Sequence, residues 1–469
     1  MEKALQIIHA IEETGYSTYV VGGAVRDRLL GLAQKDVDVV TLAPPEVVEE
    51  AAERRGWPTK TVGSAFGVTI VVVGGKAYEV ATARDERYGE DCHRPEYVEY
   101  VSDIKTDLAR RDFTVNAMAM DSRGTIIDPY GGREDLNRSM IRAVGCPEQR
   151  FAEDGLRSFR AIRLAAQYGF TIEEKTFAAI PYSLQRVSGL SIERVSNEIE
   201  KILTAHHAAY GLRLLVASGL AQTQCTTREK GKEKLVDVLP EITHLIDLPQ
   251  SPKFHSLDVW NHTLEVVEAV PQKRVLRWAA LLHDIAKGLP GIRNLSKRGH
   301  LADPGHDKKG ADMADRILTR LKVPPHTVKK VVWMVYNHMT LPHPERNTVI
   351  KWLRKQSRQF KSQEELSLAV GQLLVLARAD VKGGMVEPDF SHLNALEEMV
   401  NKILTTVPFY VAELAISGKD VAAELGSGPQ VGKFMTDALV RIQSGALDNE
   451  KNALFAALAK RKVRMKKGR

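Results

Sequence analysis

The chain has 469 residues, of which 43% are hydrophobic and 27% charged, and these values predict about three globular domains with substantial cores. No apolar run approaches the roughly 20 residues that cross a bilayer, and the N-terminus reads as an amphipathic helix rather than a signal peptide, so we expect a cytoplasmic protein with no membrane partner. The formal net charge is +7, and the last ten residues, KRKVRMKKGR, contain seven Lys or Arg, which suits a nucleic-acid partner or a solvated chain end. The three cysteines, Cys92, Cys146 and Cys225, are widely separated and indicate neither a disulfide framework nor a zinc knuckle.

Two kinds of pattern divide the chain. From Thr18 to about Asp128, short β-branched runs alternate with polar turns, which predicts a mixed sheet with a few helices. After Glu153 come long amphipathic stretches that predict helices, with weak breaks near Thr227 and Pro249, where charge and proline interrupt the periodicity. We therefore expect an α+β fold, in which a mixed-sheet head precedes an all-helical neck and body.

The stretch YVVGGAVRDRLLGLAQKDVDVV, residues 19–40, carries the first candidate site. Asp36 and Asp38 alternate with valines, so a strand points both carboxylates to one face, where two like charges favour a bound cation. The Gly-Gly turn lets the backbone approach a bulky anion, and Arg26 supplies a planar fork for phosphate. Phosphoryl transfer needs such a combination, with one or two hard divalent ions held by the aspartates. The alternative is a solvated strand face or a Gly-Gly hairpin.

Further polar residues interrupt apolar runs in the same region. Glu79 lies mid-strand in AYEVATA, where it is either a third carboxylate ligand of the metal ions or an exposed strand side chain. In RRDFTVNAMA, Arg110 and Arg111 can serve phosphate or ribose, whereas Asp112 and Asn116 offer polar groups between apolar positions that lock into the sheet.

The segment from Glu153 to Tyr168 is predicted to be one helix with a charged stripe. Its polar side chains recur every third residue, at Asp154, Arg157, Arg160 and Arg163. An exposed charged helix is the usual explanation of such a stripe.

A second constellation lies further along the chain. The adjacent pair His283 and Asp284 falls at a predicted helix end, with His262 upstream and Asp380 far downstream on separate helices. Nitrogen and carboxylate ligands from several helices can converge on a divalent transition metal or magnesium and activate water.

The motifs GGAVRD, DVD, RRDFTVNAMA, DPYGGREDL, EDGLRSFRAIRLA and ERVSNEIEKIL follow one another between Val20 and Leu203. In this order they resemble the class II tRNA nucleotidyltransferase family, which includes CCA-adding enzymes and bacterial poly(A) polymerases. The segment from His255 to Gly384 resembles an HD domain of the metal-dependent phosphohydrolase type, in which His306 and His338 are candidate ligands of a second ion. One departure is Pro304, near a position where related transferases often have an aromatic residue.

The first resemblance implies a reaction and a set of site residues. The 3′-hydroxyl of a tRNA would attack the α-phosphate of CTP or ATP with the help of two Mg²⁺ ions, near Asp36, Asp38 and Glu79. Asp154 and Arg157 would read the Watson–Crick edge of the incoming base, accepting C and A because both carry an exocyclic amine. The expected nucleotide-binding residues are Gly23, Arg26, Arg111, Asp112, Asn116, Asp154, Arg157, Arg160 and Arg163.

The resemblances also imply a domain plan and leave alternatives open. We expect a catalytic head at residues 1–140, a nucleotide- and RNA-binding neck at 141–227, an HD domain at 228–385, and a C-terminal helical body with a basic tail at 386–469. The charged insertion 84–100 resembles a loop that favours addition of CCA or its terminal A, although an ordinary hairpin loop explains it equally. The alternatives are a poly(A) polymerase, a CC-adding enzyme, or a non-catalytic RNA-binding or HD regulatory protein. The HD domain is either a phosphohydrolase or a structural module, and nothing in the sequence indicates a protein partner.

Overall fold

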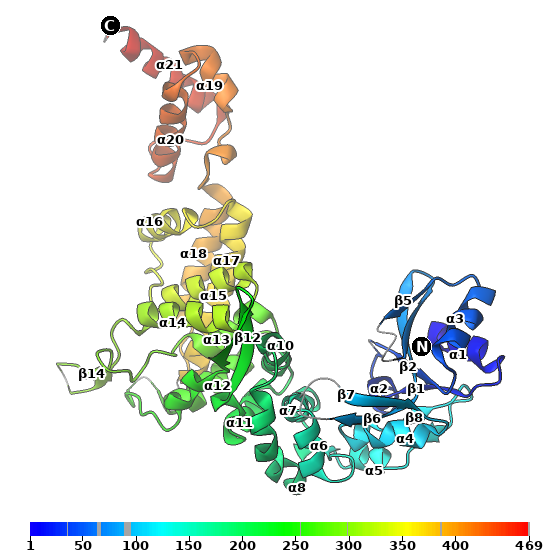
Figure 1. Cartoon of the computed structure of the whole chain (residues 1–469). Coiled ribbons are helices and arrows are strands. Elements are labelled where there is room, and N and C mark those ends of the chain that lie inside the picture. Colours follow the sequence, from blue (N-terminus) through cyan, green and yellow to red (C-terminus); the bar gives the residue numbers. More distant parts are fainter. Residues whose placement is uncertain are drawn as a thin grey trace. The chain divides into compact units, whose positions relative to one another are not determined.

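Figure 1 shows a computed structural model of the chain, which describes residues 1–34, 36–62, 67–88, 95–253, 255–297, 299–384 and 387–467. The chain divides into two units. The first contains residues 1–244 and 317–324, and the second contains residues 245–316 and 325–469. No helix within the described ranges is both long and apolar enough to cross a membrane.

The first unit begins with a mixed sheet that has, among the described residues, seven strands in the order β3-β4-β5-β2-β1-β8-β9. Strands β2 and β5 are parallel and the other neighbours are antiparallel. The predicted mixed sheet is therefore confirmed. The strands are β1 (Thr18–Val21), β2 (Asp38–Thr41), β3 (Thr59–Val62), β4 (Val68–Val73), β5 (Lys76–Thr82), β8 (Ala119–Met120) and β9 (Ile126–Ile127).

The register of the central strands brings two separate motifs together. Strand β1 pairs antiparallel with β2, so that Val21 at the end of β1 lies opposite Asp38 at the start of β2. The turn at Gly22 and Gly23 thereby comes beside the aspartates, although more than a dozen residues separate them in the chain. Val37 between the two aspartates is buried, and both aspartates are exposed, as the predicted alternation requires.

Helices cover the sheet and extend the first unit. Helices α1 and α3 contact each other and bury Ile7, Ile8 and Val48, whereas α7 packs on α10 and α11 through Phe159 and Ile162. Besides two short strand pairs, β6 (Arg84–Tyr88) with β7 (Pro95–Tyr100) and β10 (Met140–Ile141) with β11 (Thr171–Ile172), a hairpin forms from β12 (Gln224–Glu229) and β13 (Lys232–Asp237). The helices of this unit are α1 (Glu2–Glu12), α2 (Gly23–Leu29), α3 (Pro45–Arg54), α4 (Ile104–Ala109), α5 (Gly132–Asn137), α6 (Pro147–Glu153), α7 (Leu156–Tyr168), α8 (Glu174–Ala178), α9 (Leu184–Val187), α10 (Ile192–Leu203) and α11 (Ala208–Ala217).

One predicted helix is wrong in its extent. The sequence predicts a single helix from Glu153 to Tyr168, but α6 ends at Glu153 and α7 begins at Leu156. Asp154 between them has an extended backbone, and its Oδ1 accepts a hydrogen bond from the amide of Leu156 at 2.9 Å. Asp154 thus satisfies a free amide in the first turn of α7, which a residue inside a helix does not do.

The second unit is helical, as expected. Helix α12 contacts α13 and α17, and α13 contacts α15, around a core that includes Trp278, Leu281 and Val331. A separate cluster that includes Val421, Phe434 and Leu454 joins the last three helices. The elements are α12 (Val259–Ala269), α13 (Arg274–Leu282), β14 (Asn294–Leu295), β15 (Leu301–Ala302), α14 (His306–Arg320), α15 (Pro325–Asn337), α16 (Arg346–Ser357), α17 (Gln363–Gly384), α18 (Ser391–Thr406), α19 (Gly418–Leu425), α20 (Pro429–Gln443) and α21 (Lys451–Lys467).

Candidate active site

The predicted transferase residues line a cavity of about 790 Å³ in the first unit. It lies between the sheet edge at β1 and β2, the turn before η2 (Thr114–Asn116), and the helices α7 and α10. Sequence reasoning also missed residues that line it, among them Asp27, Lys76, Glu198 and Lys201. The predicted residues in its lining are Gly23, Arg26, Asp36, Asp38, Glu79, Arg111, Asp112, Asn116, Asp154, Arg157, Arg160 and Arg163.

Three carboxylates stand on one wall of this cleft. Because β2 and β5 are parallel with Val39 level with Val80, Asp38 is level with Glu79 and on the same exposed face. Although the Asp38 side chain is exposed at the cleft, the protein atoms around it partly desolvate the carboxylate and raise its pKa above the usual 3.8. Arg111 opposes this rise and the charge of Asp36 adds to it. Within the described chain, the three acids do not form a group whose ligand atoms all lie within 4.8 Å of one another.

The two glycines at the start of α2 lie close to two arginine side chains. Gly22 has a φ of 68°, and a Cβ added there would lie 3.0 Å from Nη1 of Arg111. A Cβ at Gly23 would lie 3.2 Å from Nη2 of Arg26. The Gly-Gly turn therefore admits two guanidinium groups beside the backbone, in addition to any approach of a ligand.

Arg26 is buried and held on three sides. Its guanidinium donates to Oδ1 of Asp27 at 2.8 Å, to the hydroxyl of Tyr168 at 2.6 Å, and to the side-chain oxygen of Asn116. Tyr168 ends α7, so Arg26 ties the sheet edge to the helix that carries the arginine stripe. Nothing in the local sequence pairs these residues, because Tyr168 is 142 positions away from Arg26.

Arg111 is oriented by an acid that sequence reasoning missed. Asp107 on α4 is buried, and its two oxygens bind Arg110 at 2.6 Å and Arg111 at 3.1 Å. Burial alone would raise the pKa of Asp107, but the positive charges of Arg110 and Arg111 lower it below the usual 3.8. The spacing of i to i+3 and i+4 on a helix is the signal that could have predicted both pairs.

Asp112 and Asn116 organise the floor of the cleft. Oδ2 of Asp112 binds Nη2 of Arg160 at 2.7 Å, and Oδ1 accepts from the amide of Phe113 and from Asn116. Burial would raise the pKa of Asp112, but Arg160 and then Arg157 outweigh it and lower the pKa. Asp112 therefore stays ionised and fixes Arg160 above the aspartates.

The predicted base-reading pair also has protein partners. Nη1 of Arg157 donates to the carbonyl of Arg150 at 3.0 Å and to Glu153, and Nη2 donates to the carbonyl of Arg110 at 3.1 Å. Oδ1 of Asp154 accepts from the amide of Leu156, the first residue of α7, while Oδ2 lies 4.0 Å from Arg194. The structure thus presents both side chains in fixed orientations at the cleft.

Each predicted arginine of the cleft is paired with a carboxylate. Glu198 on α10 binds Arg163 at 2.6 Å and Lys201 at 3.2 Å, which brings a third helix to the site. The complete set of pairs is Arg26 with Asp27, Arg111 with Asp107, Arg157 with Glu153, Arg160 with Asp112, and Arg163 with Glu198. We refer to this set below as the cleft ion pairs.

The second unit contains a cluster of metal-ligand side chains, and all six predicted residues reach it. Asp284 lies at its centre, with Oδ2 at 3.2 Å from Nε2 of His283 and Oδ1 at 3.3 Å from Nε2 of His306. Nε2 of His262 is 3.0 Å from Oδ1 of Asp380 and 3.3 Å from Nε2 of His283. His338 completes a second histidine pair, with Nε2 3.1 Å from that of His306.

The histidines of this cluster are oriented for ligation. Nδ1 of His283, His306 and His338 contacts a backbone carbonyl at 2.8, 2.6 and 2.6 Å, which leaves Nε2 turned to the cluster. Burial and the neighbouring His283 lower the pKa of His338 to about 4, so its imidazole is neutral at neutral pH. Two groups of ligands result, His262 with His283 and Asp284, and Asp284 with His306 and His338. Asp284 belongs to both.

Sequence reasoning missed a lysine at this cluster. Nζ of Lys287 lies 2.7 Å from Oδ2 of Asp284 and 2.8 Å from Oε1 of Gln250, at the wall of a cavity of about 540 Å³. The HDIAKG motif places Lys287 one helical turn after Asp284, which is the signal for this contact.

A mixed sheet with carboxylates at its edge, facing a cleft lined with arginines, defines the class of metal-dependent nucleotidyltransferases. Residues 18–142 match the family model described as the Poly A polymerase head domain, and residues 169–223 match a probable RNA and SrmB-binding site of polymerase A. Residues 254–377 match the HD domain. Nucleotidyltransferase and HD domains generally use divalent metals. The cluster of His262, His283, Asp284, His306, His338 and Asp380, called the HD cluster below, provides candidate ligands here.

Known proteins similar to this chain narrow the class. The CCA-adding enzyme of Geobacillus kaustophilus (strain HTA426) is 35% identical over 98% of this chain and 97% of its own length, and that of Geobacillus stearothermophilus is equally similar. The crystal structure of the Bacillus stearothermophilus CCA-adding enzyme in complex with CTP matches all of this chain and 99% of that chain, with a TM-score of 0.67 at 29% identity. The chain belongs to the CCA-adding enzyme family. The resemblance inferred from the ordered motifs is thereby confirmed.

Proposed function

We propose that the protein adds CCA, or its terminal A, to the 3′ end of tRNA from CTP and ATP, by nucleotidyl transfer without a nucleic-acid template. The observation that carries this proposal is the convergence of Asp36, Asp38 and Glu79 with nine predicted nucleotide-binding residues in one cleft. The full-length similarity to CCA-adding enzymes supports it. A cytoplasmic location fits these substrates.

The carboxylate wall suits two Mg²⁺ ions. Asp36, Asp38 and Glu79 offer only hard oxygen ligands. Desolvation raises the pKa of Asp38 and the neighbouring charge of Asp36 adds to the rise, so a bound cation would favour the ionised form of both acids. When bound, such ions activate the attacking hydroxyl and stabilise the charge on the α-phosphate and the leaving pyrophosphate. The aspartates would hold the ions, and Arg111 and Arg160 would bind triphosphate oxygens opposite them.

Base selection is assigned to Asp154 and Arg157. A carboxylate accepts from an exocyclic amine and a guanidinium donates to ring or carbonyl acceptors, so the pair accepts cytosine and adenine and disfavours uracil and guanine. The backbone carbonyls and Glu153 that hold Arg157 would keep its donors in place before the nucleotide arrives.

A single product analysis tests this function. The protein is incubated with tRNA ending at the discriminator base, or after CC, with CTP and ATP singly and together, and the products are sequenced. We expect defined CCA ends, or addition of A alone to tRNA ending in CC. Products ending in CC would identify a CC-adding enzyme, long A tails a poly(A) polymerase, and no extension a non-catalytic RNA-binding protein.

The HD cluster supports a second activity, hydrolysis of phosphate esters such as 2′,3′-cyclic phosphates. The supporting observation is Asp284, whose two oxygens face two histidine pairs, as a carboxylate bridging two divalent transition-metal ions would. Its test is hydrolysis of 2′,3′-cyclic AMP by the purified protein with added Ni²⁺, Co²⁺ or Mn²⁺, compared with Asp284→Ala. Equal rates for the two proteins would reduce the cluster to a structural role.

A further inference from the structure

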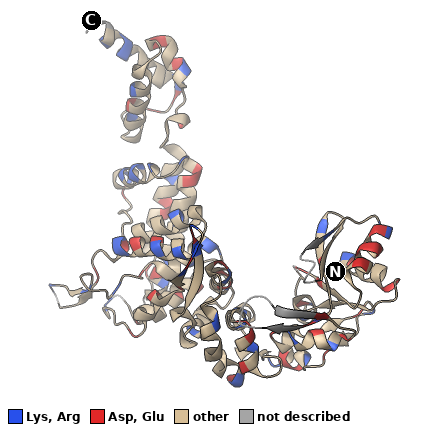
Figure 2. Cartoon of the chain, viewed as in Figure 1, with Lys and Arg blue, Asp and Glu red and all other residues tan. Residues whose placement is uncertain are grey.

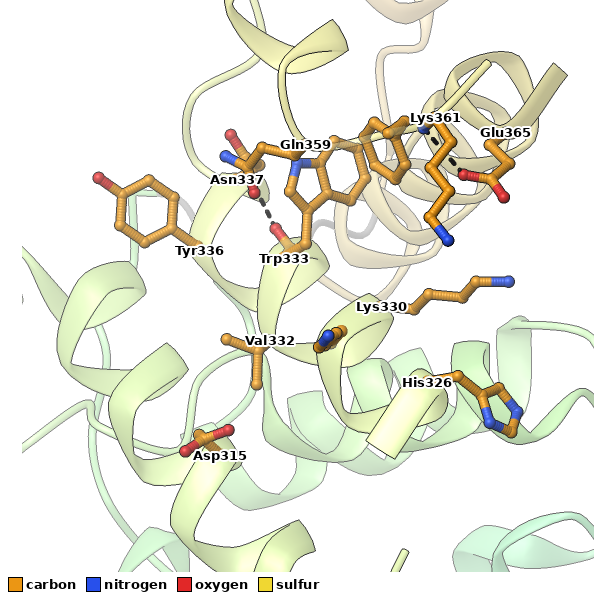
Figure 3. A pocket seen from close by; sticks show the side chains of 12 residues that line it. Asp315, His326, Lys330, Val332, Trp333, Tyr336, Asn337, Gln359, Lys361 and Glu365 are labelled. Atoms are coloured by element: carbon orange, nitrogen blue, oxygen red, sulfur yellow. Dashed lines mark hydrogen bonds between the residues drawn. The ribbon is translucent and has the colours of Figure 1, made fainter. Parts of the chain in front are cut away.

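A second cavity of the second unit contains no residue of the transferase cleft and no candidate metal ligand. It encloses about 680 Å³ between α15, the end of α14, and the connection from α16 to α17. Its lining, shown in Figure 3, combines the aromatic rings of Trp333, Tyr336 and Phe360 with three lysines, Lys329, Lys330 and Lys361.

The aromatic side of this cavity is held rigidly. Nε1 of Trp333 donates to Oε1 of the buried Gln356 at 3.0 Å, and Nε2 of Gln356 donates to Asn337 at 3.0 Å. Phe360 meets Trp333 edge to face, with ring centroids 5.1 Å apart and planes at 82°. Phe360 is half-buried and Tyr336 is 38% exposed, so part of each residue remains open to a ligand.

The cavity lining contains three lysines and two acids, Asp315 and Glu365. Among the described residues, the ammonium groups of Lys329, Lys330 and Lys361 form no ion pair, in contrast to the arginines of the transferase cleft. Figure 3 shows Lys361 extending toward the side on which Lys330 lies. Of the two acids in the lining, Glu365 accepts a hydrogen bond from the amide of Lys361 at 3.0 Å, and Asp315 lies apart in the same view.

The surrounding chain is basic as well. Residues 325–363 contain eight Lys or Arg and one acid, Glu345. Four of the cations belong to α16, and Figure 2 shows positive charge along that helix. Aromatic rings beside cations are a combination that binds unpaired nucleotides in general, because bases stack on the rings while phosphates contact the cations.

We infer that this cavity binds RNA, taking one or two unpaired nucleotides whose bases stack on Phe360 and Tyr336 and whose phosphates contact Lys329, Lys330 and Lys361. The choice of tRNA as the RNA rests on the function proposed above. The aromatic rings and the lysines lie within the second unit, so the contact is additional to the binding of the reacting 3′ end at the transferase cleft.

The test measures binding rather than catalysis. Fluorescence anisotropy gives the dissociation constant of labelled tRNA in the full chain carrying Asp36→Ala, with and without the triple change Lys329→Ala, Lys330→Ala and Lys361→Ala. We expect the triple variant to bind about tenfold more weakly, and the slope of log affinity against log salt to become shallower by about 2. The control is Lys402→Ala on α18, which removes an exposed lysine outside the cavity. We expect this control to change the dissociation constant and the salt slope by no more than the loss of a single phosphate contact would.

A second pair of variants separates stacking from charge. Phe360→Leu and Tyr336→Leu keep apolar contacts but remove the flat rings, and we expect each to weaken tRNA binding about fivefold or more with an unchanged salt slope. Cross-linking of 4-thiouridine-labelled tRNA should then yield peptides from residues 325–361 in the chain that carries Asp36→Ala alone. Unchanged affinity in the lysine and ring variants would overturn the inference.

Competition distinguishes RNA from other occupants. Polyglutamate that displaces tRNA as well as an equal length of oligouridylate would overturn the inference in favour of an acidic protein segment. Complete displacement by millimolar AMP would overturn it in favour of a free nucleotide. All of these measurements use a chain with the transferase site inactivated. The tRNA-binding results can therefore be interpreted even if the proposed nucleotide addition fails its own test.

Discussion

Asp36 and Asp38 differ from every arginine around them in having no ion-pair partner among the described residues. The cleft ion pairs balance the basic side chains, so unbalanced negative charge gathers at the two aspartates. Like charges held side by side disfavour each other unless a cation binds, which makes the aspartates the expected position of the metal ions.

Replacing Asp36 should therefore abolish nucleotide addition without unfolding the head. Asp36 is exposed and makes no hydrogen bond with the described residues, so Asp36→Ala removes the proposed metal ligand at little cost to the free energy of unfolding. The rate of incorporation of CTP and ATP into tRNA should fall by at least about 10³-fold, in the range found when charge stabilisation is removed. The control Glu53→Ala removes an exposed acid from α3. Retained incorporation by folded Asp36→Ala protein would contradict the metal-ligand assignment.

Asp107 is the buried acid whose loss should cost most stability. Asp107→Asn leaves Arg110 and Arg111 without their charged partner, and we expect a loss of about 3 kcal/mol in the free energy of unfolding at pH 7. The measurement is urea unfolding of the variant beside Glu46→Gln, which alters an exposed acid of α3.

The same variant should also change the response to acid. The folded pKa of Asp107 lies below the usual 3.8, so its ionised form stabilises the fold fully above pH 3.8, and this contribution disappears as the pH falls through the folded value. The difference between the natural chain and Asp107→Asn should thus be constant near neutral pH and shrink below about pH 4. A difference that grows on acidification would contradict this account.

At the scale of elements, α7 is positioned by a close approach to α11. A Cβ added at Gly211 would lie 2.6 Å from Cβ of Ala166 and 2.8 Å from Ile202, so Gly211→Ala must push the helices apart. We expect a loss of about 2 kcal/mol in stability and a higher KM for CTP and ATP, because α7 carries Arg157, Arg160 and Arg163.

The matched control is another helical glycine with open space around it. Nothing lies within 4 Å of a Cβ at Gly371 in α17, so Gly371→Ala should stabilise the chain by about 0.5 to 1 kcal/mol and leave the KM unchanged. Thermal unfolding and initial-rate kinetics of both variants measure the contrast. Equal effects of the two substitutions would show that α7 does not depend on this packing.

The sequence predicted the members of the cleft but not their partners. Asp36, Asp38 and the arginine stripe stand out because charges interrupt local periodicity, which a single segment reveals. Some partners come from segments far apart in the chain that only folding brings together, as in the pairs Asp112 with Arg160 and Arg26 with Tyr168. The error at Asp154 was local: an Asp before Gly and an apolar run is a helix start, and periodicity of charges hid it.

At the scale of the whole molecule, each chemistry is confined to one unit. Every residue of the transferase cleft belongs to the first unit, and every ligand of the HD cluster belongs to the second. Asp284→Ala should therefore abolish metal binding and any cyclic-phosphate hydrolysis while leaving CCA addition within about twofold of the natural rate. Metal content by mass spectrometry and the two assays on one preparation measure this; a parallel loss of both activities would contradict it.

The cleft ion pairs also affect the electrostatic contribution to nucleotide binding. Since each of these arginines already contacts a carboxylate, a triphosphate that binds them as proposed would not neutralise a bare positive surface but would replace an internal anion. The internal carboxylates cancel much of the electrostatic attraction between the arginines and the triphosphate. Tight binding would then depend on how well the nucleotide fits the cleft and on the magnesium that accompanies the substrate. Other polyanions of the cell, which lack that fit, would gain little by entering.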